Sequence, residues 1–468
     1  MHASGPGRAG RPGAGVRMTE ELLLGLDLGT EFTKAAAVTL DGVERSHGRA
    51  RTPWRIVQTG AEMEPAALVD AALAAAKEAL EDERAGRVVG VGVTGMAETG
   101  VLLDTGGEPV APMIAWHDTR GDQQAAEVAE AFGPDRFSER TGLPVSRLCS
   151  LSKYRWMRAH IPEAKRGVRW LNVAEWIVRR LGGRDVAELS LSSRTGFLDL
   201  AARRPWDEVL GWAEAPDGLL PELVDAGVPA GKVDGTLAEA EGAVVTVAGH
   251  DQPCAMVGSG ATRTGDVFDS CGTAEAFVRA VQPRVPSDAI RRAVAGGVTV
   301  GWHVVPGELG LMAGFVSGLA LQRFLDLLGV TAEGREELDE VALRIPSGAE
   351  GVVVRDVISD RATVEGIHRS ATPAHVWRAA LEAVSRHGAD VLATIESVAG
   401  ATDRLVETGG WARSPAVRAV KREVLGPFEE PEVDEAGARG AALIAGIAAG
   451  VYRDTSDLPP IRWRNQDR

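Results

Sequence analysis

The sequence has few cysteines, few aromatic residues and no long hydrophobic run. Its three cysteines, Cys149, Cys254 and Cys271, have the spacing of neither a metal motif nor a disulfide framework. A fold held together by disulfides is therefore excluded, and a reducing cytoplasm is favoured. No apolar stretch approaches the ~20 residues that a membrane-spanning helix needs. We therefore expect a cytoplasmic protein without a membrane partner.

Basic residues are also scarce relative to acidic ones. The 51 lysines and arginines against 66 aspartates and glutamates give a net charge of −15, and no basic block occurs. Phosphate backbones are bound by basic surfaces, so nucleic acid is excluded as the main partner. The expected partner is a small molecule instead.

Glycine is abundant, with 56 of 468 residues, which predicts many tight turns and close backbone contacts. The length predicts two or three domains. The first 17 residues are rich in glycine, proline and arginine and lack an apolar segment, so they do not form a signal peptide. We expect residues 1–18 to be a disordered tail, with Met18 as a candidate start.

Alternating apolar segments and glycine turns predict an α/β fold. Residues 22–26 and 33–40 indicate two strands joined by a turn at Gly29-Thr30. A helix is expected over 65–83, a buried strand over 87–95, and a strand with a turn over 101–112. Residues 119–233 are predicted to be helix-rich, with tryptophans that fill the core: Trp156, Trp170, Trp176, Trp206 and Trp212.

The same scheme of strand, Gly-Thr turn and strand occurs twice. The second copy surrounds Gly272-Thr273, and the two Gly-Thr pairs lie 243 residues apart (272 − 29). This repetition predicts two similar lobes that face each other across a cleft. Chance similarity between two short hairpins is the alternative.

Two familiar nucleotide motifs are excluded. Gly90, Gly92 and Gly95 spell G-x-G-x-x-G, but a dinucleotide site requires a helix to begin at this turn, and a strand-like segment follows instead. The glycines alternate with valines and are expected inside a strand. A P-loop pattern does not occur.

The Gly-Thr turns suit a different phosphate site. Successive backbone N–H groups of a glycine turn bind anions, and threonine adds a hydroxyl donor. Asp27, at the end of the first strand, would repel phosphate, but it could hold a divalent cation that bridges phosphates. For a single hairpin, an aspartate that only stabilises the turn is the simpler reading.

Two further segments point to chemistry. In "AVVTVAGHDQ" an apolar strand delivers Asp251 at its end, where it serves as a helix cap, a ligand or a base. In "ETGGWARSP" the pair Gly409-Gly410 allows the backbone to approach a flat ligand. Ser414 and the proline after it predict the start of a helix. A tightly packed helix pair is the alternative for this second segment.

Taken together in this order, the motifs resemble those of the FGGY family of carbohydrate kinases, from Leu22 to about Val451. The matching segments are "DLGT" at 27–30, "GHDQ" at 249–252, "SCGTAEA" at 270–276 and "GGWARS" at 409–414. The resemblance implies two ribonuclease-H-like lobes, as in actin-like ATPases, with ATP in the cleft. The expected domains are an N-terminal lobe over 19–242, a C-terminal lobe over 243–455 and a tail over 456–468.

By resemblance, Asp251 is the general base that takes a proton from the acceptor hydroxyl. The family implies Mg²⁺ and ATP, with Asp27 and Asp251 as metal ligands. The residues expected to bind ATP are Gly29, Thr30, Lys34, Gly272, Thr273, Gly409, Gly410, Trp411 and Ser414.

The acceptor is a sugar or polyol whose identity the motifs leave open. The residues expected to contact it are Met96, Ala97, Glu98, Trp116, Asp118, His250 and Gln252. Where glycerol kinases carry Arg-Glu and xylulokinases Met-His, this chain has Ala97-Glu98, and Leu148 stands at a tyrosine position of glycerol kinases. A ketopentose, another ketose or a polyol of four to six carbons remains open.

Two other functions use the same fold: a nucleotide-driven switch of the actin or chaperone kind, and a catalytically inactive sugar sensor. Both Gly-Thr turns together with Asp27 and Asp251 favour the kinase. A homodimer is a possible assembly.

Overall fold

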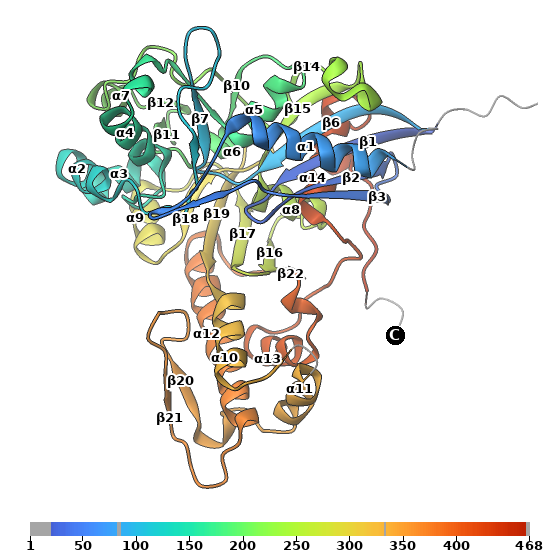
Figure 1. Ribbon diagram of the computed structural model, residues 1–468. Coiled ribbons are helices and arrows are strands. Elements are labelled where there is room, and N and C mark those ends of the chain that lie inside the picture. Colours follow the sequence, from blue (N-terminus) through green and yellow to red (C-terminus); the bar gives the residue numbers. More distant parts are fainter. Residues whose placement is uncertain (1–19, 82–85, 332–333, 465–468) are drawn as a thin grey trace, which may run out of the picture.

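The protein, seen as a computed structural model, consists of two lobes built on separate sheets (Figure 1). The structure describes residues 20–81, 86–331 and 334–464. The tail expected at 1–18 lies outside these residues. The α/β fold with two lobes, predicted from the repeated hairpin, is confirmed.

The sheet of the first lobe has six strands in the order β14-β15-β6-β1-β2-β3. The apolar runs of its central strands are buried on both faces, which explains why they show little alternation. The six strands of this sheet are β1 (Glu21–Leu28), β2 (Phe32–Thr39), β3 (Glu44–Arg51), β6 (Arg87–Gly95), β14 (Pro229–Lys232) and β15 (Val244–His250).

The second lobe has a five-stranded sheet in the order β18-β19-β17-β16-β22. Its strands are β16 (Asp266–Cys271), β17 (Glu275–Val281), β18 (Thr299–Trp302), β19 (Leu309–Phe315) and β22 (Arg404–Thr408). In both sheets an antiparallel hairpin (β1–β2, β16–β17) is followed by a parallel neighbour of its first strand (β6, β22). This shared pairing confirms the predicted repeat.

Helices cover both sheets and build the insert between 119 and 233. Helix α1, predicted to end at residue 83, ends at Leu80. The insert is helix-rich as predicted, and its tryptophans are buried or packed against its core. The helices are α1 (Pro65–Leu80), α2 (Asp122–Phe132), α3 (Pro134–Thr141), α4 (Ser150–His160), α5 (Val173–Arg180), α6 (Leu189–Ser192), α7 (Asp207–Trp212), α8 (Asp251–Gly258), α9 (Ser287–Ala295), α10 (Ser317–Leu327), α11 (Arg335–Leu343), α12 (Pro373–Ala399), α13 (Pro415–Leu425) and α14 (Ala436–Ala448).

Shorter strands complete the lobes in two- and three-stranded pairings. They are β4 (Arg55–Val57), β5 (Gly60–Met63), β7 (Gly100–Leu103), β8 (Met113–Ile114), β9 (Arg169–Asn172), β10 (Val186–Glu188), β11 (Leu198–Asp199), β12 (Arg204–Pro205), β13 (Glu222–Val224), β20 (Val353–Arg355) and β21 (Thr363–Glu365). No helix among the described residues is long and apolar enough to cross a bilayer.

The glycines of the apparent dinucleotide motif lie in strand β6, as predicted, and they serve packing. Helix α14 lies directly on this strand and on β1 (Figure 1). A Cβ atom at Gly92 would lie less than 3.0 Å from the backbone of Ala441, and one at Gly25 less than 3.0 Å from Ala438 and Ala442. The small residues of sheet and helix therefore allow a close backbone approach.

This packing corrects the lobe boundary expected at 242/243. Strand β15 pairs with β6 in the first sheet, and α14 covers that sheet although it is the last helix of the chain. The second sheet begins only at Asp266. Sequence periodicity does not reveal which sheet a strand joins, because the pairing is decided in three dimensions.

The segment expected as a tail from residue 456 is packed where the structure describes it. Glu432 N–H donates to the carbonyl of Arg462 at 2.8 Å, and Arg464 N–H donates to that of Glu430 at 2.9 Å. The Arg404 guanidinium lies 4.8 Å from the Trp463 ring centroid. The chain end therefore contributes to the second lobe as far as residue 464.

Candidate functional site

Asp251 lies at the junction between β15 and α8, as the first residue of the helix. Its Oδ1 accepts a hydrogen bond from the Gln252 N–H at 2.7 Å, and His250 Nε2 lies 3.2 Å from the same oxygen. Oδ2 accepts no hydrogen bond from the described residues. Asp251 is thus oriented through one oxygen, while the other is available to an incoming hydroxyl.

The surroundings of Asp251 bring the pKa of its carboxyl close to neutral pH. Burial, together with the nearby charges of Asp27 and Glu98, raises its pKa to about 7, whereas the Gln252 N–H and Arg194 oppose the shift. His250 is buried, and this burial holds its pKa well below the usual value, so it is neutral. A carboxyl with these properties matches a general base at physiological pH.

Asp27, at the end of β1, faces the same space. Its Oδ1 is buried and has no hydrogen-bond partner among the described residues, and a Cβ atom at Gly437 would clash with its Oδ2. The carboxylate therefore lies against the N-terminus of α14. Burial raises its pKa to about 6, opposed by Lys34. An unpartnered carboxylate beside a second one suits a divalent cation, which fits the predicted ligands Asp27 and Asp251.

Helix α14 connects these two acids mechanically. It begins beside Asp27 and packs against α8, because Gly440 and Gly258 allow the two helices to touch at backbone distance. The position of Asp251 relative to Asp27 is consequently set by rigid elements.

The first Gly-Thr turn joins β1 to β2 as predicted. Trp54 Nε1 donates to the Thr30 carbonyl at 2.7 Å, and Trp116 Nε1 donates to the Thr30 hydroxyl at 3.0 Å. Within the described chain, the Thr30 N–H donates to no other group. Two indoles thus hold the turn while leaving its backbone donor available to an anion.

The second turn contacts the glycine pair of the adenosine motif. Gly409 has a φ of 106°, and a Cβ atom there would clash with the Cys271 backbone beside Gly272. Leu319 N–H donates to the Thr273 carbonyl at 3.0 Å, which fixes the turn against α10. The backbone beside Gly272 is therefore brought against Gly409. That these two turns bind ATP stays a prediction.

The remaining predicted ATP ligands lie at this lobe or at the first turn. The Arg335 guanidinium lies 4.1 Å from the centroid of the Trp411 ring, and the Trp377 ring packs against Trp411 as well. Lys34 is not free, because its Nζ lies 2.6 Å from Glu435 Oε2. To reach phosphate, Lys34 would have to exchange this partner.

Ser414 is a helix cap, and its hydroxyl already donates one hydrogen bond and accepts another. It donates to Asp339 Oδ2 at 2.7 Å and accepts from the Val417 N–H at 3.3 Å. The predicted N-cap is confirmed, whereas the geometry argues against a direct ATP contact from this side chain. Ser414 positions the loop before it.

Glu98, which is predicted to contact the acceptor, is held by Arg194, a residue that sequence analysis missed. Arg194 Nε donates to Glu98 Oε1 at 2.6 Å, and Arg194 Nη1 donates to Thr299 Oγ1 at 2.7 Å. Glu98 has a φ of 60°, an unusual backbone conformation outside glycine that presents its side chain at the turn. Arg194 is separated from Glu98 by 96 residues, and no motif marks it.

An aromatic cluster adjoins the first turn. Trp116 packs edge-on against His117 with ring centroids 5.2 Å apart, and Trp54 lies 6.3 Å from the same imidazole. The contact of Trp116 with the acceptor stays a prediction. Trp54 was not singled out from the sequence, because no motif marks it.

Asp118, predicted to bind the acceptor, is instead a structural residue. It is fully buried, and its two oxygens accept hydrogen bonds from Thr59, Ala61 and Arg120. Arg120 holds its pKa low against the opposing effect of burial. Because these bonds occupy both carboxylate oxygens, neither is available to the acceptor. The prediction that Asp118 binds the acceptor is therefore corrected.

Met96 and Ala97 are also almost completely buried, at 3 % and 2 % exposure. They shape the turn that carries Glu98, and no polar atom of their side chains is available for a sugar. Gln252 Oε1 is buried without a partner among the described residues. Gln252 is therefore an apt acceptor ligand beside Asp251.

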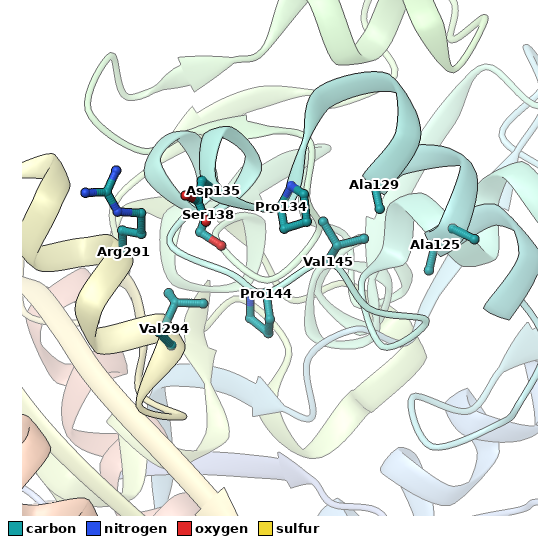
Figure 2. A pocket seen from close by; sticks show the side chains of 11 residues that line it. Ala125, Ala129, Pro134, Asp135, Ser138, Pro144, Val145, Arg291 and Val294 are labelled. Atoms are coloured by element: carbon teal, nitrogen blue, oxygen red, sulfur yellow. The ribbon is translucent and has the colours of Figure 1, made fainter.

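A separate groove lies between the insert and the second lobe, and Figure 2 shows it from close by. It is lined mainly by alanine, proline and valine side chains of α2, α3 and α9. None of the predicted site residues lines it. The groove is thus distinct from the cleft that holds Asp251.

Known proteins resemble this chain over almost its full length. The N-terminal domain of the FGGY family of carbohydrate kinases matches residues 22–258, and the C-terminal domain of that family matches residues 354–449. A glycerol kinase of Dechloromonas aromatica is 31 % identical over 96 % of this chain and 93 % of its own length. One of Aromatoleum aromaticum is 29 % identical over 95 % and 93 %.

Solved structures of carbohydrate kinases also resemble this chain over almost its full length. The xylulose kinase of Rhodospirillum rubrum superposes with a TM-score of 0.86 at 27 % identity, covering 94 % of this chain and 93 % of that one. The glycerol kinase of Plasmodium falciparum with ADP, at 17 % identity and a TM-score of 0.84 over 95 % and 93 %, shares the fold. These matches establish that the chain belongs to the FGGY family of carbohydrate kinases and uses ATP.

Proposed function

We propose that the protein transfers the γ-phosphoryl group of ATP to a hydroxyl of a neutral polyol or ketose, with Asp251 as the general base. The observation that carries this proposal is the placement of Asp251, which has one oxygen oriented by the Gln252 N–H and lies close enough to Asp27 and Glu98 to feel their charges. The relatives are named for glycerol and xylulose, which are neutral polyhydroxy compounds.

In the proposed reaction, Asp251 accepts the proton of the acceptor hydroxyl while the oxygen of that hydroxyl attacks the γ-phosphorus. An O–P bond forms, the bond between the γ-phosphorus and the bridging oxygen breaks, and ADP leaves. The two Gly-Thr turns bind the phosphate oxygens through backbone N–H groups. Phosphoryl transfer depends mainly on such alignment and on charge neutralisation.

Mg²⁺ fits the pair formed by Asp27 and Asp251, and when bound it would neutralise phosphate charge. Asp27 supplies an oxygen that has no other partner, and its place at the α14 N-terminus keeps it rigid. Cytoplasmic location and a homodimer remain predictions.

The acceptor side favours a substrate without charge. Arg194 is paired with Glu98 at 2.6 Å, so its charge is already balanced and a sugar acid would find no free cation there. Glu98 and Gln252 offer oxygen acceptors for hydroxyl donors, and Trp116 offers an apolar face for the carbon chain.

A screen of ADP release across acceptors tests the proposed function. Glycerol, erythritol, xylitol, D-xylulose and D-ribulose are compared with gluconate and with no acceptor. We expect at least one neutral compound to give kcat in the usual range of about 1–10³ s⁻¹, and gluconate to give little more than the background. ADP release that is equal with and without every acceptor would instead support the nucleotide-driven switch.

Asp27→Asn is expected to raise the Mg²⁺ concentration that gives half-maximal activity by about ten-fold, because one charged ligand is lost. The Asp27 side chain touches the α14 N-terminus, so folding is checked by thermal unfolding. Asp225→Asn, at a partly exposed carboxyl that pairs with Arg203, serves as the control. An unchanged Mg²⁺ dependence would remove Asp27 from the metal site.

A further inference from the structure

Behind the nucleotide side of the cleft, a buried lysine is surrounded by three carboxyl groups. Lys421 is 2 % exposed, and its Nζ lies 2.6 Å from Asp269 Oδ2, 3.0 Å from Glu275 Oε1 and 2.8 Å from Glu407 Oε1. All three carboxyl groups are buried as well. We call these four residues the Lys421 cluster.

The cluster joins the elements that carry the turn at Gly272-Thr273 and the turn at Gly409-Gly410. Asp269 lies on β16, three residues before Gly272, and Glu275 begins β17, two residues after Thr273. Glu407 lies on β22, two residues before Gly409. Lys421 belongs to α13, the helix that Ser414 caps at the end of the adenosine motif. A single ammonium group therefore ties together the strands that flank Gly272-Thr273 and precede Gly409-Gly410.

The charges of the cluster do not balance. Three carboxyl groups face one ammonium, and burying unpaired charge is costly, so the cluster retains protons. Burial raises the pKa of Asp269 and of Glu407, while Lys421 opposes the shift. Burial acts to lower the pKa of Lys421, but its carboxyl neighbours outweigh it and keep that pKa high.

Two further titratable groups of the described chain act on the cluster, and neither carries a positive charge. Cys271 Sγ lies 3.8 Å from Glu275 Oε2, and Glu430 adds a negative charge near Glu407. Among the described residues, Lys421 is the cation whose charge lowers the pKa of Asp269, of Cys271 and of Glu407. Loss of its charge would leave the carboxyl groups to repel one another directly behind Gly272 and Gly409.

We propose that Lys421 is a positioning residue for the nucleotide, which fixes the turns at Gly272-Thr273 and Gly409-Gly410 in one relative geometry through Asp269, Glu275 and Glu407. This inference rests on the proposed function, because it assigns ATP to those turns. Lys421 does not face the cleft and touches no substrate. Its effect is therefore expected on the nucleotide, whereas Glu98 and Asp251 follow strands β6 and β15 of the first sheet.

Lys421→Met tests this proposal, with Arg422→Met as the matched control. Arg422 is the next residue of α13, but its guanidinium pairs with Glu430 at 2.9 Å, outside the cluster. The dissociation constant of MgADP is measured by calorimetry, and KM is measured for ATP and for the acceptor. We expect Lys421→Met to weaken MgADP and to raise KM for ATP by about ten-fold, with the acceptor KM changed less than about two-fold. Arg422→Met should leave all three near wild type.

The pH dependence provides a readout that a loss of packing would not produce. In Lys421→Met the repulsion exists only while the carboxyl groups are ionised, and lowering the pH adds protons and removes it. The weakening of MgADP binding relative to wild type should therefore shrink as the pH falls from 8 to 6 and grow as it rises. The double variant Lys421→Met/Glu407→Gln, which removes one repelling group, should recover part of the affinity.

The outcomes are separable. If wild-type protein binds no MgADP, the proposed function fails; if it binds and Lys421→Met binds equally well, the positioning role fails. Equal weakening of nucleotide and acceptor would indicate a general loss of structure and would also overturn the proposal. If Lys421→Met does not fold, the double variant decides: MgADP binding weakened about three-fold or more with an unchanged acceptor KM supports the role, and wild-type affinity contradicts it.

Discussion

Asp251→Asn is expected to lower kcat by about 10³-fold, within the range that general-base catalysis contributes, while MgADP binding stays within about two-fold of wild type. The asparagine Oδ1 can still accept the Gln252 N–H that now orients Asp251 at 2.7 Å, so the side chain keeps its place. What it loses is the ability to take a proton. Turnover of the best acceptor, together with calorimetric titration of MgADP, measures the two quantities separately.

The control for this variant is Asp104→Asn. Asp104 Oδ1 also accepts backbone N–H groups, from Gly106 at 2.9 Å and Glu108 at 3.1 Å, but it lies in an exposed turn after β7. The same chemical change there should leave kcat unaltered. If Asp251→Asn kept near-normal turnover, Asp251 would serve only the start of α8, and the base would have to be another residue.

Gly25→Val is expected to prevent folding of the first lobe, or to lower the free energy of unfolding by about 3 kcal/mol or more, at the upper end of overpacking effects. The new Cβ atom would lie less than 3.0 Å from three backbone atoms of α14. Backbone cannot rotate away as a side chain can, so the helix would have to leave the sheet. Thermal unfolding and the yield of soluble protein measure this effect.

Gly211→Val provides the comparison. Gly211 lies in α7, and a Cβ atom there meets nothing within 4 Å. Its effect should stay within about 1 kcal/mol, the scale of helix propensity. Equal stability of the Gly25 and Gly211 variants would show that the close approach of α14 to β1 is dispensable.

The hairpins and the strand β6 could be predicted because their signals are local. Apolar runs such as 22–26, which end at a glycine turn, leave few alternatives to a buried strand, and the valines between Gly90 and Gly95 reinforce that reading. The order of four short motifs then predicted the family and the position of Asp251. These features depend on residues that are neighbours in sequence.

The missed and corrected features depend on partners far apart in the chain. Arg194 matters because it reaches Glu98 and Thr299, and no local pattern marks such an ion pair. Asp118 resembled a ligand in a Trp-x-Asp segment, but its oxygens are taken by Ala61 and Arg120. The hydroxyl of Ser414 is taken by Asp339 on α11. Sequence suggests a polar group; only the fold shows whether it is already satisfied.

Helix α14 also determines when this protein can fold during its synthesis. Strand β1 ends at Leu28, and α14 begins at Ala436, so 408 residues (436 − 28) separate the first strand from the helix that covers it. At ~5–20 residues per second a ribosome needs roughly 20–80 s to bridge that interval. Throughout that time the glycine-lined face of β1 and β6 stays uncovered on the nascent chain. A stop codon before position 436 would thus also prevent the N-terminal half from completing its fold, although every residue of that half had been translated.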